Sequence, residues 1–196
     1  TAGVTAINYA RNHLDETRLL NEEAVRKMAQ WSANHSCRIV HFSTDFVFDG
    51  EKGMYNESDP CLPISSYGQS KLNSESILLA ELKNSAIVRT VLVYGYANSL
   101  SRSNFPLFIK THLEKGKTLT ITADQFRTHT HAEDLAKATM DLALSEHCGI
   151  FHIAGPEYLS VFEFALKIAE TFQLDSSLLK PIHTEIHAST DKRPLK

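Results

Sequence analysis

Residues 43–50 read Ser-Thr-Asp-Phe-Val-Phe-Asp-Gly, and residues 67–71 read Tyr-Gly-Gln-Ser-Lys. The first stretch ends a β-branched and aromatic run at 38–44, which predicts a buried strand. The second opens a predicted helix. Residues four apart on a helix share one face, so we expect Tyr67 and Lys71 to point into the same space. A hydroxyl from the end of the strand can meet them there.

A hydroxyl, a phenol and an ammonium group together suit proton transfer to a carbonyl oxygen during hydride transfer. The two candidate hydroxyls are Ser43 and Thr44. Because successive strand residues face opposite ways, only one of them is expected to face the site. We take Thr44 as the partner and Ser43 as the alternative. Asp49 and Gly50 also fit an ordinary turn, since both residue types favour turns.

The chain around these motifs alternates helix and strand. Apolar periodicity predicts a helix at 15–35, and apolar runs at 38–44 and 86–94 predict strands on either side of a helix at 67–82. A strand–helix–strand unit implies a parallel sheet. Ligands bind at the carboxyl edge of such sheets, so the turn-rich segment 45–63 is expected to lie over the site.

The second half of the chain predicts shorter elements. Ser160 is expected to cap a helix at 161–172, with Glu163 as its capping-box partner. The residues after this helix are expected to be irregular. The remaining predictions are a strand tail at 1–8, helices at 104–114 and 132–145, strands at 119–121 and 150–154, and a polar loop at 124–130.

Composition bounds the class of protein. A chain of 196 residues can bury a full core, as one domain or as one domain with a small lobe. The net charge of -3 gives no basic excess for nucleic acid or an anionic membrane. No apolar run approaches the ~20 residues of a membrane span, and the first residues show no secretory-signal pattern. We therefore expect neither a nucleic-acid nor a membrane partner.

Cysteines and histidines predict no metal site. Cys37, Cys61 and Cys148 are far apart and odd in number, which is typical of reduced thiols in a cytoplasmic protein. Two histidine pairs could each share one face of an element, but neither has further ligands beside it. These pairs are His129 with His131, and His183 with His187.

The combined motif resembles the extended branch of the short-chain dehydrogenase/reductase superfamily, and in particular the dTDP-4-dehydrorhamnose reductase family. A bare Tyr-x-x-x-Lys occurs by chance in many helices. Here it follows a strand-end hydroxyl pair, Phe48-Asp49-Gly50 and Tyr55-x-Glu57, which makes the resemblance specific. Further matches are Glu75, Arg89, Tyr94-Gly95, Asn104-Phe105, Asp124-Gln125, Thr130 and Arg193-Pro194.

The resemblance implies an α/β fold, a Rossmann-like doubly wound parallel sheet with a small C-terminal substrate lobe. Residues 1–95 and 131–155 would belong to the NAD(P)-binding domain, and residues 96–130 and 156–196 to the lobe. The chain has eight glycines and no Gly-x-x-Gly-x-x-Gly turn near its start. The sheet is therefore expected to be incomplete, with its first, phosphate-binding half missing.

The resemblance also implies a reductase that transfers a hydride from NADP or NAD in reduced form to the keto group of a nucleotide-linked sugar, giving dTDP-rhamnose from dTDP-4-dehydrorhamnose. Tyr67 would donate a proton to the ketone oxygen, and Thr44 would orient that oxygen. Lys71 would bring the phenol pKa, ordinarily about 10, toward the working pH and would hold the cofactor ribose. Ser43 and Arg89 are further cofactor-binding candidates.

Five residues are expected to bind the substrate: Asp45 and Glu57 at sugar hydroxyls, and Asn104, Gln125 and Arg193 at the nucleotide or its phosphates. Arg89 also fits a structural ion pair, and Arg193 a solvated tail charge. The resemblance further allows a homodimer and a divalent metal such as magnesium in its assembly.

Three positions depart from the pattern of the family. His129 stands where proline is usual, Arg127 where glycine is frequent, and Ser74 where glycine is usual. These departures bear on the sugar specificity more than on the hydride chemistry. Two other functions fit the same scaffold. One is a nucleotide-sugar epimerase or dehydratase that retains NAD. The other is a non-catalytic partner like the regulatory subunit of methionine adenosyltransferase.

Overall fold

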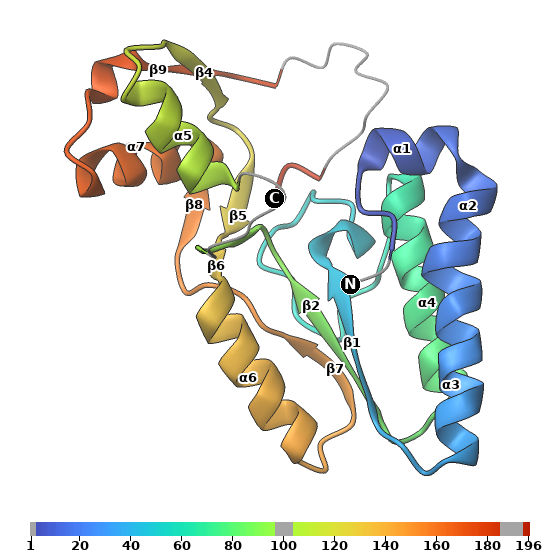
Figure 1. Ribbon diagram of the computed structural model, residues 1–196. Helices are drawn as coiled ribbons and strands as arrows, with labels where there is room; N and C mark the ends of the chain where they lie inside the picture. Colours follow the sequence, from blue (N-terminus) through green and yellow to red (C-terminus); the bar gives the residue numbers. More distant parts are fainter. Residues whose placement is uncertain (1–2, 97–103, 185–193) are drawn as a thin grey trace.

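A parallel sheet forms the centre of the computed structural model, which describes residues 3–96, 104–184 and 194–196 (Figure 1). Its strands are β1 (Ile39–Thr44), β2 (Ser85–Thr90) and β7 (Gly149–His152), in the order β1-β2-β7. Among the described residues β1 pairs only with β2, so its outer edge carries no partner strand. The predicted α/β class with a parallel sheet is confirmed.

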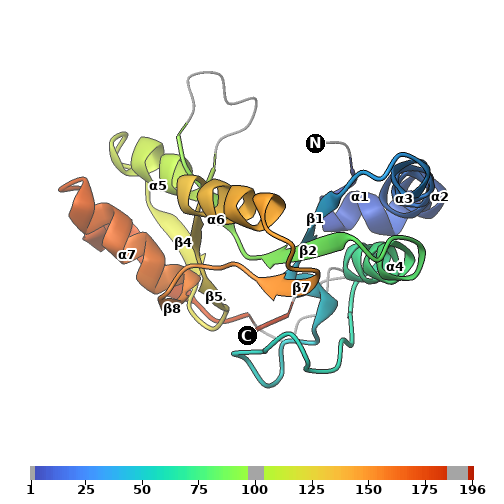
Figure 2. The ribbon, with the colours of Figure 1, turned by 90° about the horizontal axis from the view of Figure 1, so that it is seen from below.

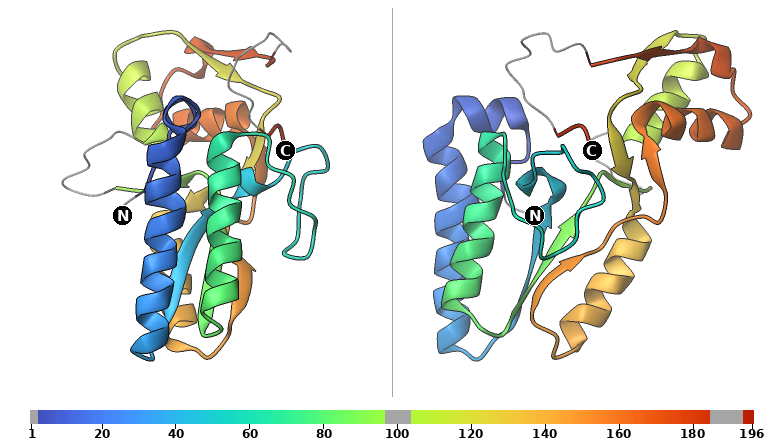
Figure 3. Two further views of the ribbon diagram at one scale, coloured as in Figure 1. Left: turned by 90° about the vertical axis from the view of Figure 1, so that its right-hand side faces the viewer. Right: turned by 180° about the vertical axis from the view of Figure 1, so that it is seen from behind.

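Helices cover both faces of the sheet. On one face lie α3 (Ala24–Asn34) and α4 (Ser66–Glu81), which run side by side (Figure 3). On the other face lies α6 (Ala132–Leu144), with the strands between it and α4 (Figure 2). Before α3 come α1 (Ile7–Asn12), α2 (Leu14–Arg18) and a π-helical turn, η1 (Leu19–Glu23).

Alternation along β2 explains why both faces are covered. Ile87 is fully buried against α3 and α4, in a cluster with Leu78. Its neighbours Ala86 and Val88 point the other way and pack against α6. Successive residues of a strand face opposite sides, so an unbroken apolar run needs two covering layers.

A second group of elements forms a lobe at the carboxyl end of the sheet. Two strands, β4 (Leu119–Thr122) and β9 (Leu179–Ile182), pair in parallel. A second pair, β5 (Phe126–Thr128) and β8 (Tyr158–Ser160), is antiparallel. The other elements are α5 (Phe105–Leu113), α7 (Val161–Thr171) and the short 3-10 helix η3 (Ser176–Leu178).

The lobe has its own hydrophobic core. Ile109 of α5, Ile121 of β4 and Ile168 of α7 are buried together in it. The predicted capping box of α7 is present, because Ser160 and Glu163 each accept a hydrogen bond from the backbone N–H of the other. This core is separate from those of the main sheet, which fits the expected division into two parts, although that division stays a prediction.

Four predicted segments differ from the structure. The strand expected at 86–94 is broken at Leu92, whose φ is 34°, so that β2 ends and β3 (Val93–Tyr94) pairs instead with β6 (Thr130–His131). The expected loop at 124–130 contains β5, the expected irregular tail contains β9, and α1 begins inside the expected strand tail at 1–8. The added strands are two to four residues long, too short to show a period.

No helix in the described ranges combines the length and the apolar character that a membrane crossing needs.

A buried ion pair fixes α4 to the sheet. Glu75 of α4 accepts hydrogen bonds from Arg89 of β2, at 3.0 Å to Nε and 2.6 Å to one terminal nitrogen. Ser43 of β1 also donates to this carboxylate. Glu75 and Arg89 are 1% and 4% exposed, so water screens their attraction little.

Glu75→Gln should lower the free energy of unfolding by about 3–5 kcal/mol, because it leaves the Arg89 charge buried without its counterion. Glu114→Gln is the matched control, since Glu114 pairs with Lys110 on the surface at 2.6 Å. It should cost at most about 1 kcal/mol. Urea unfolding measures both variants. A similar small loss in each would contradict a structural role for the buried pair.

Leu78→Ala should also destabilise the protein, by about 2–5 kcal/mol, because it opens a cavity between α4 and the sheet. The next residue provides the control: Leu79 is 41% exposed, so Leu79→Ala should cost much less. The same urea titration compares the two. An equal loss from both truncations would mean that the helix is rotated relative to the face described here.

Candidate active site

The end of β1 and the first turn of α4 are in close contact. Ser65 caps α4 by accepting a hydrogen bond from the N–H of Gly68 at 3.1 Å. A Cβ on Gly68 would collide with the carbonyl oxygen of Phe46, so only glycine lets the chain after β1 lie against this turn. The contact brings the phenol of Tyr67 near the hydroxyl of Thr44.

Lys71 does not lower the pKa of Tyr67 in this structure. Burial raises the pKa of the Tyr67 phenol, the hydrogen bond with Thr44 opposes that change, and the Asp45 carboxylate adds to it. The Lys71 ammonium instead lies 3.0 Å from Nε2 of His41. The expectation that Lys71 acidifies Tyr67 is wrong here, because Lys71 turns toward the face of the sheet.

His41 is a neighbour of the site that sequence reasoning missed. It lies on β1 two residues before Ser43, and its Nε2 is 3.0 Å from both Lys71 Nζ and the hydroxyl of Ser74. Burial lowers the pKa of His41 to about 3, so the ring is neutral and can accept a hydrogen bond from the ammonium. Burial lowers the pKa of Lys71 to about 8. The strand period could have found His41, because it shares a face with Ser43.

The two further cofactor-binding candidates, Ser43 and Arg89, belong to the buried ion-pair cluster of Glu75. The Arg89 guanidinium also lies over the ring of Phe48, 5.2 Å from its centroid, and contacts the sulfur of Cys61 at 3.2 Å. These contacts give both residues a structural role. Their cofactor-binding roles stay predictions.

The substrate-binding candidates are spread over different elements. Asn104 caps α5 by accepting from the N–H of Leu107 at 3.2 Å, and Gln125 donates to the hydroxyl of Thr184 at 3.2 Å. Arg193 lies outside the described residues. The substrate roles of these residues stay predictions.

Glu57 belongs to the loop that follows β1, and it lies beside the end of β7. Its carboxylate accepts a hydrogen bond from the backbone N–H of His152 at 2.8 Å, and this bond holds the pKa of Glu57 below its ordinary value. No described contact joins Glu57 to Tyr67 or Thr44, so its proposed contact with a sugar hydroxyl is untested.

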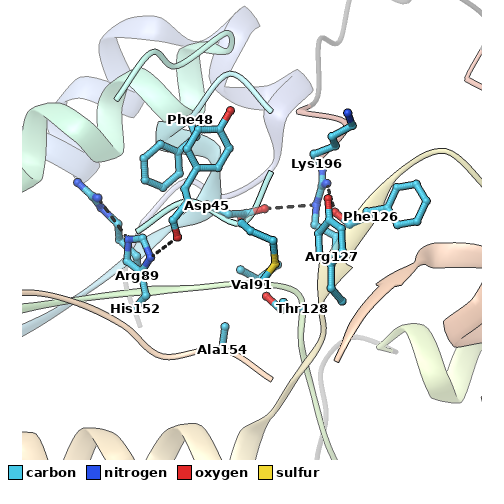
Figure 4. Close-up of a pocket in the computed structure, with 13 residues that line it drawn as sticks. Asp45, Phe48, Arg89, Val91, Phe126, Arg127, Thr128, His152, Ala154 and Lys196 are labelled. Carbon is cyan, nitrogen blue, oxygen red and sulfur yellow. Dashed lines mark hydrogen bonds and ion pairs between the residues drawn. The ribbon is translucent and has the colours of Figure 1, made fainter. Parts of the chain in front are cut away.

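A cavity of about 230 Å³ opens beside Asp45, at the carboxyl ends of β2 and β7 (Figure 4). Two stacked aromatic pairs line it. In one, Phe48 and Tyr55 have ring centroids 4.3 Å apart, and in the other, Phe126 and Tyr158 are 5.4 Å apart. The cavity is smaller than the roughly 300–1,000 Å³ of sites that enclose a drug-sized ligand. Its volume fits a ligand, or part of a ligand, smaller than a drug-sized molecule.

Asp45 connects the strand end to the lobe. Its carboxylate accepts a hydrogen bond from the Thr44 hydroxyl at 3.1 Å and lies 3.3 Å from Nε of Arg127 on β5 (Figure 4). Burial raises the pKa of Asp45, and the Arg127 guanidinium opposes that change. The position where the family frequently has glycine therefore carries the counterion of Asp45.

His129, the other departure in this segment, is part of the lobe core. It is buried and stacks on Phe164 with ring centroids 3.9 Å apart. Burial lowers its pKa to about 4. Gly155 passes so close that a Cβ there would collide with the carbonyl oxygen of His129. His129 thus packs the lobe rather than facing the strand-end hydroxyls.

The polar groups at this edge fit the nicotinamide–ribose end of a dinucleotide. Besides Thr44, Tyr67 and Lys71, the hydroxyl of Thr90 is buried there without a hydrogen-bond partner in the described chain, opposite Thr44 in the sheet register. These groups include both donors and acceptors. The 196 residues contain no glycine-rich turn for the phosphates. The fit is therefore limited to the reactive end.

A search of the described ranges finds no group of three or more His, Cys, Asp or Glu side chains that could hold a metal ion. The expected magnesium thus gains no support.

Comparison with known proteins identifies several relatives of this chain. The chain is 32% identical to the spore coat polysaccharide biosynthesis protein SpsK of Bacillus subtilis, over 99% of this chain and 67% of that protein. It is 31% identical to methionine adenosyltransferase 2 subunit beta of Bos taurus, over 87% of this chain and 53% of that protein. The chain therefore spans between half and about two thirds of these relatives.

A solved structure has the same fold. The dTDP-4-dehydrorhamnose reductase of Bacillus anthracis, in complex with NADP, superposes with a TM-score of 0.91 at 27% identity, over 98% of this chain and 67% of that one. The family described as RmlD substrate binding domain matches residues 1–196. The chain belongs to the RmlD substrate-binding domain family.

Proposed function

We propose that the protein is an NADPH- or NADH-dependent reductase of a nucleotide-linked keto sugar. The observation that carries the proposal is the close packing of the first turn of α4, which holds Tyr67, against the end of β1, which holds Thr44: the rings of Tyr67 and Phe46 have centroids 5.7 Å apart. A hydroxyl pair at the carboxyl edge of a parallel sheet lies where such folds bind their ligands. The NADP-bound reductase of Bacillus anthracis, which shares this fold, supports the choice of cofactor.

In this mechanism, side chains of the protein would transfer the proton to the ketone oxygen. Bound nicotinamide supplies the hydride to the carbonyl carbon. Tyr67 donates its phenolic proton to the ketone oxygen, which becomes the hydroxyl of the reduced sugar, and Thr44 holds the reacting oxygens in place. Lys71, with a pKa lowered to about 8, is mostly protonated at neutral pH. Its ammonium, which lies beside His41 in this structure, would hold the cofactor ribose.

The proposed substrate is dTDP-4-dehydrorhamnose. Its sugar ring would enter the cavity beside Asp45, where the stacked aromatic pairs can pack against C–H groups. The nucleotide would extend to Asn104, Gln125 and Arg193, and Glu57 would contact a sugar hydroxyl. Residues 1–95 and 131–155 would then bind the cofactor, and residues 96–130 and 156–196 the substrate. We also propose that the protein is cytoplasmic and forms a homodimer.

Tyr67→Phe should reduce turnover by at least about a hundredfold, because general acid–base groups contribute roughly 10²–10⁴-fold. The assay follows NADPH and NADH oxidation by the full-length gene product with dTDP-4-dehydrorhamnose. Tyr9→Phe is the matched control, since Tyr9 donates to Glu16 at 2.6 Å on the exposed side of α1. Tyr67→Phe with unchanged turnover would remove Tyr67 from the mechanism.

A second candidate is the binding-partner function. The match to methionine adenosyltransferase 2 subunit beta favours it. A protein that binds NADPH, turns over no keto sugar and forms a stable complex with a catalytic subunit would support this function instead. An epimerase or dehydratase would be indicated by NAD that stays bound through purification.

A further inference from the structure

The Lys71 ammonium is held against β1 by a neutral side chain. Its Nζ lies 3.0 Å from Nε2 of His41, and α4 packs against β1 beside this contact (Figure 1). Within the described ranges, His41 is the one side chain that accepts a hydrogen bond from Lys71. Both residues are half-buried, so the ammonium depends on this acceptor more than a surface lysine would.

Two groups lie close to the lone pair of His41 Nε2. The Ser74 hydroxyl is also 3.0 Å away, but it is closer to another acceptor, the carbonyl oxygen of Lys71, at 2.7 Å. The hydroxyl has a single proton, and the ammonium can only donate. We therefore assign the Ser74 proton to the carbonyl and the Nε2 lone pair to Lys71, which leaves the proton of the ring on Nδ1.

In the described chain, no carboxylate takes the place of His41 at Lys71. Glu75 is one helical turn further along α4, where it could pair with Lys71. Its carboxylate is already bonded to Arg89, at 3.0 and 2.6 Å, and to Ser43. Burial lowers the pKa of His41 to about 3, so its ring is uncharged at neutral pH. An uncharged acceptor fixes the position of an ammonium without neutralising it.

We propose that His41 is a positioning residue for Lys71: it fixes the ammonium on the sheet-facing side of α4 and leaves its positive charge available to the cofactor ribose. The inference rests on the proposed reductase function, in which Lys71 holds that ribose. Two of the three ammonium protons remain for the ribose hydroxyls. A lysine side chain that is already fixed also loses less conformational freedom when the cofactor binds.

The experiment measures NADPH binding by calorimetry, without substrate, in variants of the full-length gene product. His41→Phe keeps a ring but has no acceptor, so it should weaken NADPH binding by about tenfold. His41→Gln should keep most of the affinity, because its amide oxygen can accept in place of Nε2. Ser74→Ala is the matched control and should leave the affinity nearly unchanged, because the Ser74 proton lies on the Lys71 carbonyl.

The pKa of Lys71 is a second readout, which a merely structural role would not move. Carbon-13 NMR of labelled lysine measures it, with Lys71→Met to assign the signal. Burial lowers this pKa to about 8. Loss of the acceptor destabilises the charged form, so His41→Phe should lower the pKa by roughly one further unit, and His41→Gln should not. The other charged or titratable groups on the facing surfaces, Glu75, Tyr67 and Arg89, stay in place in both variants.

An NADPH affinity and a Lys71 pKa that are the same in His41→Phe as in the natural protein would overturn the proposal. Equal losses of affinity in His41→Phe and His41→Gln would also overturn it, because the ring would then matter for packing and not as an acceptor. A loss in Ser74→Ala as large as in His41→Phe would assign the lone pair to Ser74 instead.

A further measurement decides if His41→Phe does not fold. Nitrogen-15 NMR of labelled histidine should show Nε2 of His41 without a proton, and Lys71→Met should change its signal. A signal that Lys71→Met leaves unchanged rejects the contact between the two side chains.

Failure of the proposed function has a different signature. A natural protein that binds neither NADPH nor NADH would overturn that function and, with it, the role of His41 toward the ribose. NADPH binding that persists unchanged in His41→Phe would overturn the positioning role alone and leave the reductase in place.

Discussion

The buried Glu75–Arg89 ion pair is the constraint on which the candidate site depends. Two charges taken out of water are tolerated only when their partners are correctly placed, and here Arg89 comes from β2 and Glu75 from α4. The pair therefore fixes the rotation of α4 about its axis. Tyr67, Lys71 and Glu75 follow one another at intervals of four residues, so fixing Glu75 also fixes the other two.

This helix face makes three different contacts with the sheet. Tyr67 packs on Phe46 just after β1, Lys71 contacts His41, and Glu75 contacts Arg89. The i, i+4 spacing predicted from the sequence is thus the spacing that the structure uses. What the spacing could not show is that each side chain has its own partner. Lys71 lies 3.0 Å from the ring nitrogen of His41 on the facing strand, a residue that the helical spacing alone does not reveal.

An element could be predicted from the sequence when the residues that determine it are close together in the chain. The helices at α3, α4 and α7 were predicted because their apolar periods and caps are written in neighbouring residues. In the lobe, β4 was predicted, but β5, β8 and β9 were missed because their partners are remote in sequence: Leu179 of β9 pairs with Leu119 of β4. The break at Leu92 also depends on pairing, since the residues after it join β6. The pKa of Tyr67 was mispredicted because burial is a property of the assembled fold.

Arg127 and His129 stand where the family usually has other residues. These two positions tell more about the structure of this protein than residues that match the family pattern would. A glycine at position 127 would leave Asp45 without the counterion that the lobe now supplies. Instead, Arg127 contacts both Asp45 and the carbonyl of Pro194, so the carboxyl group and the C-terminal segment share one anchor. The position of the lobe and the ionisation of Asp45 cannot then vary independently. A lobe displaced from the sheet would therefore break the ion pair between Arg127 and Asp45.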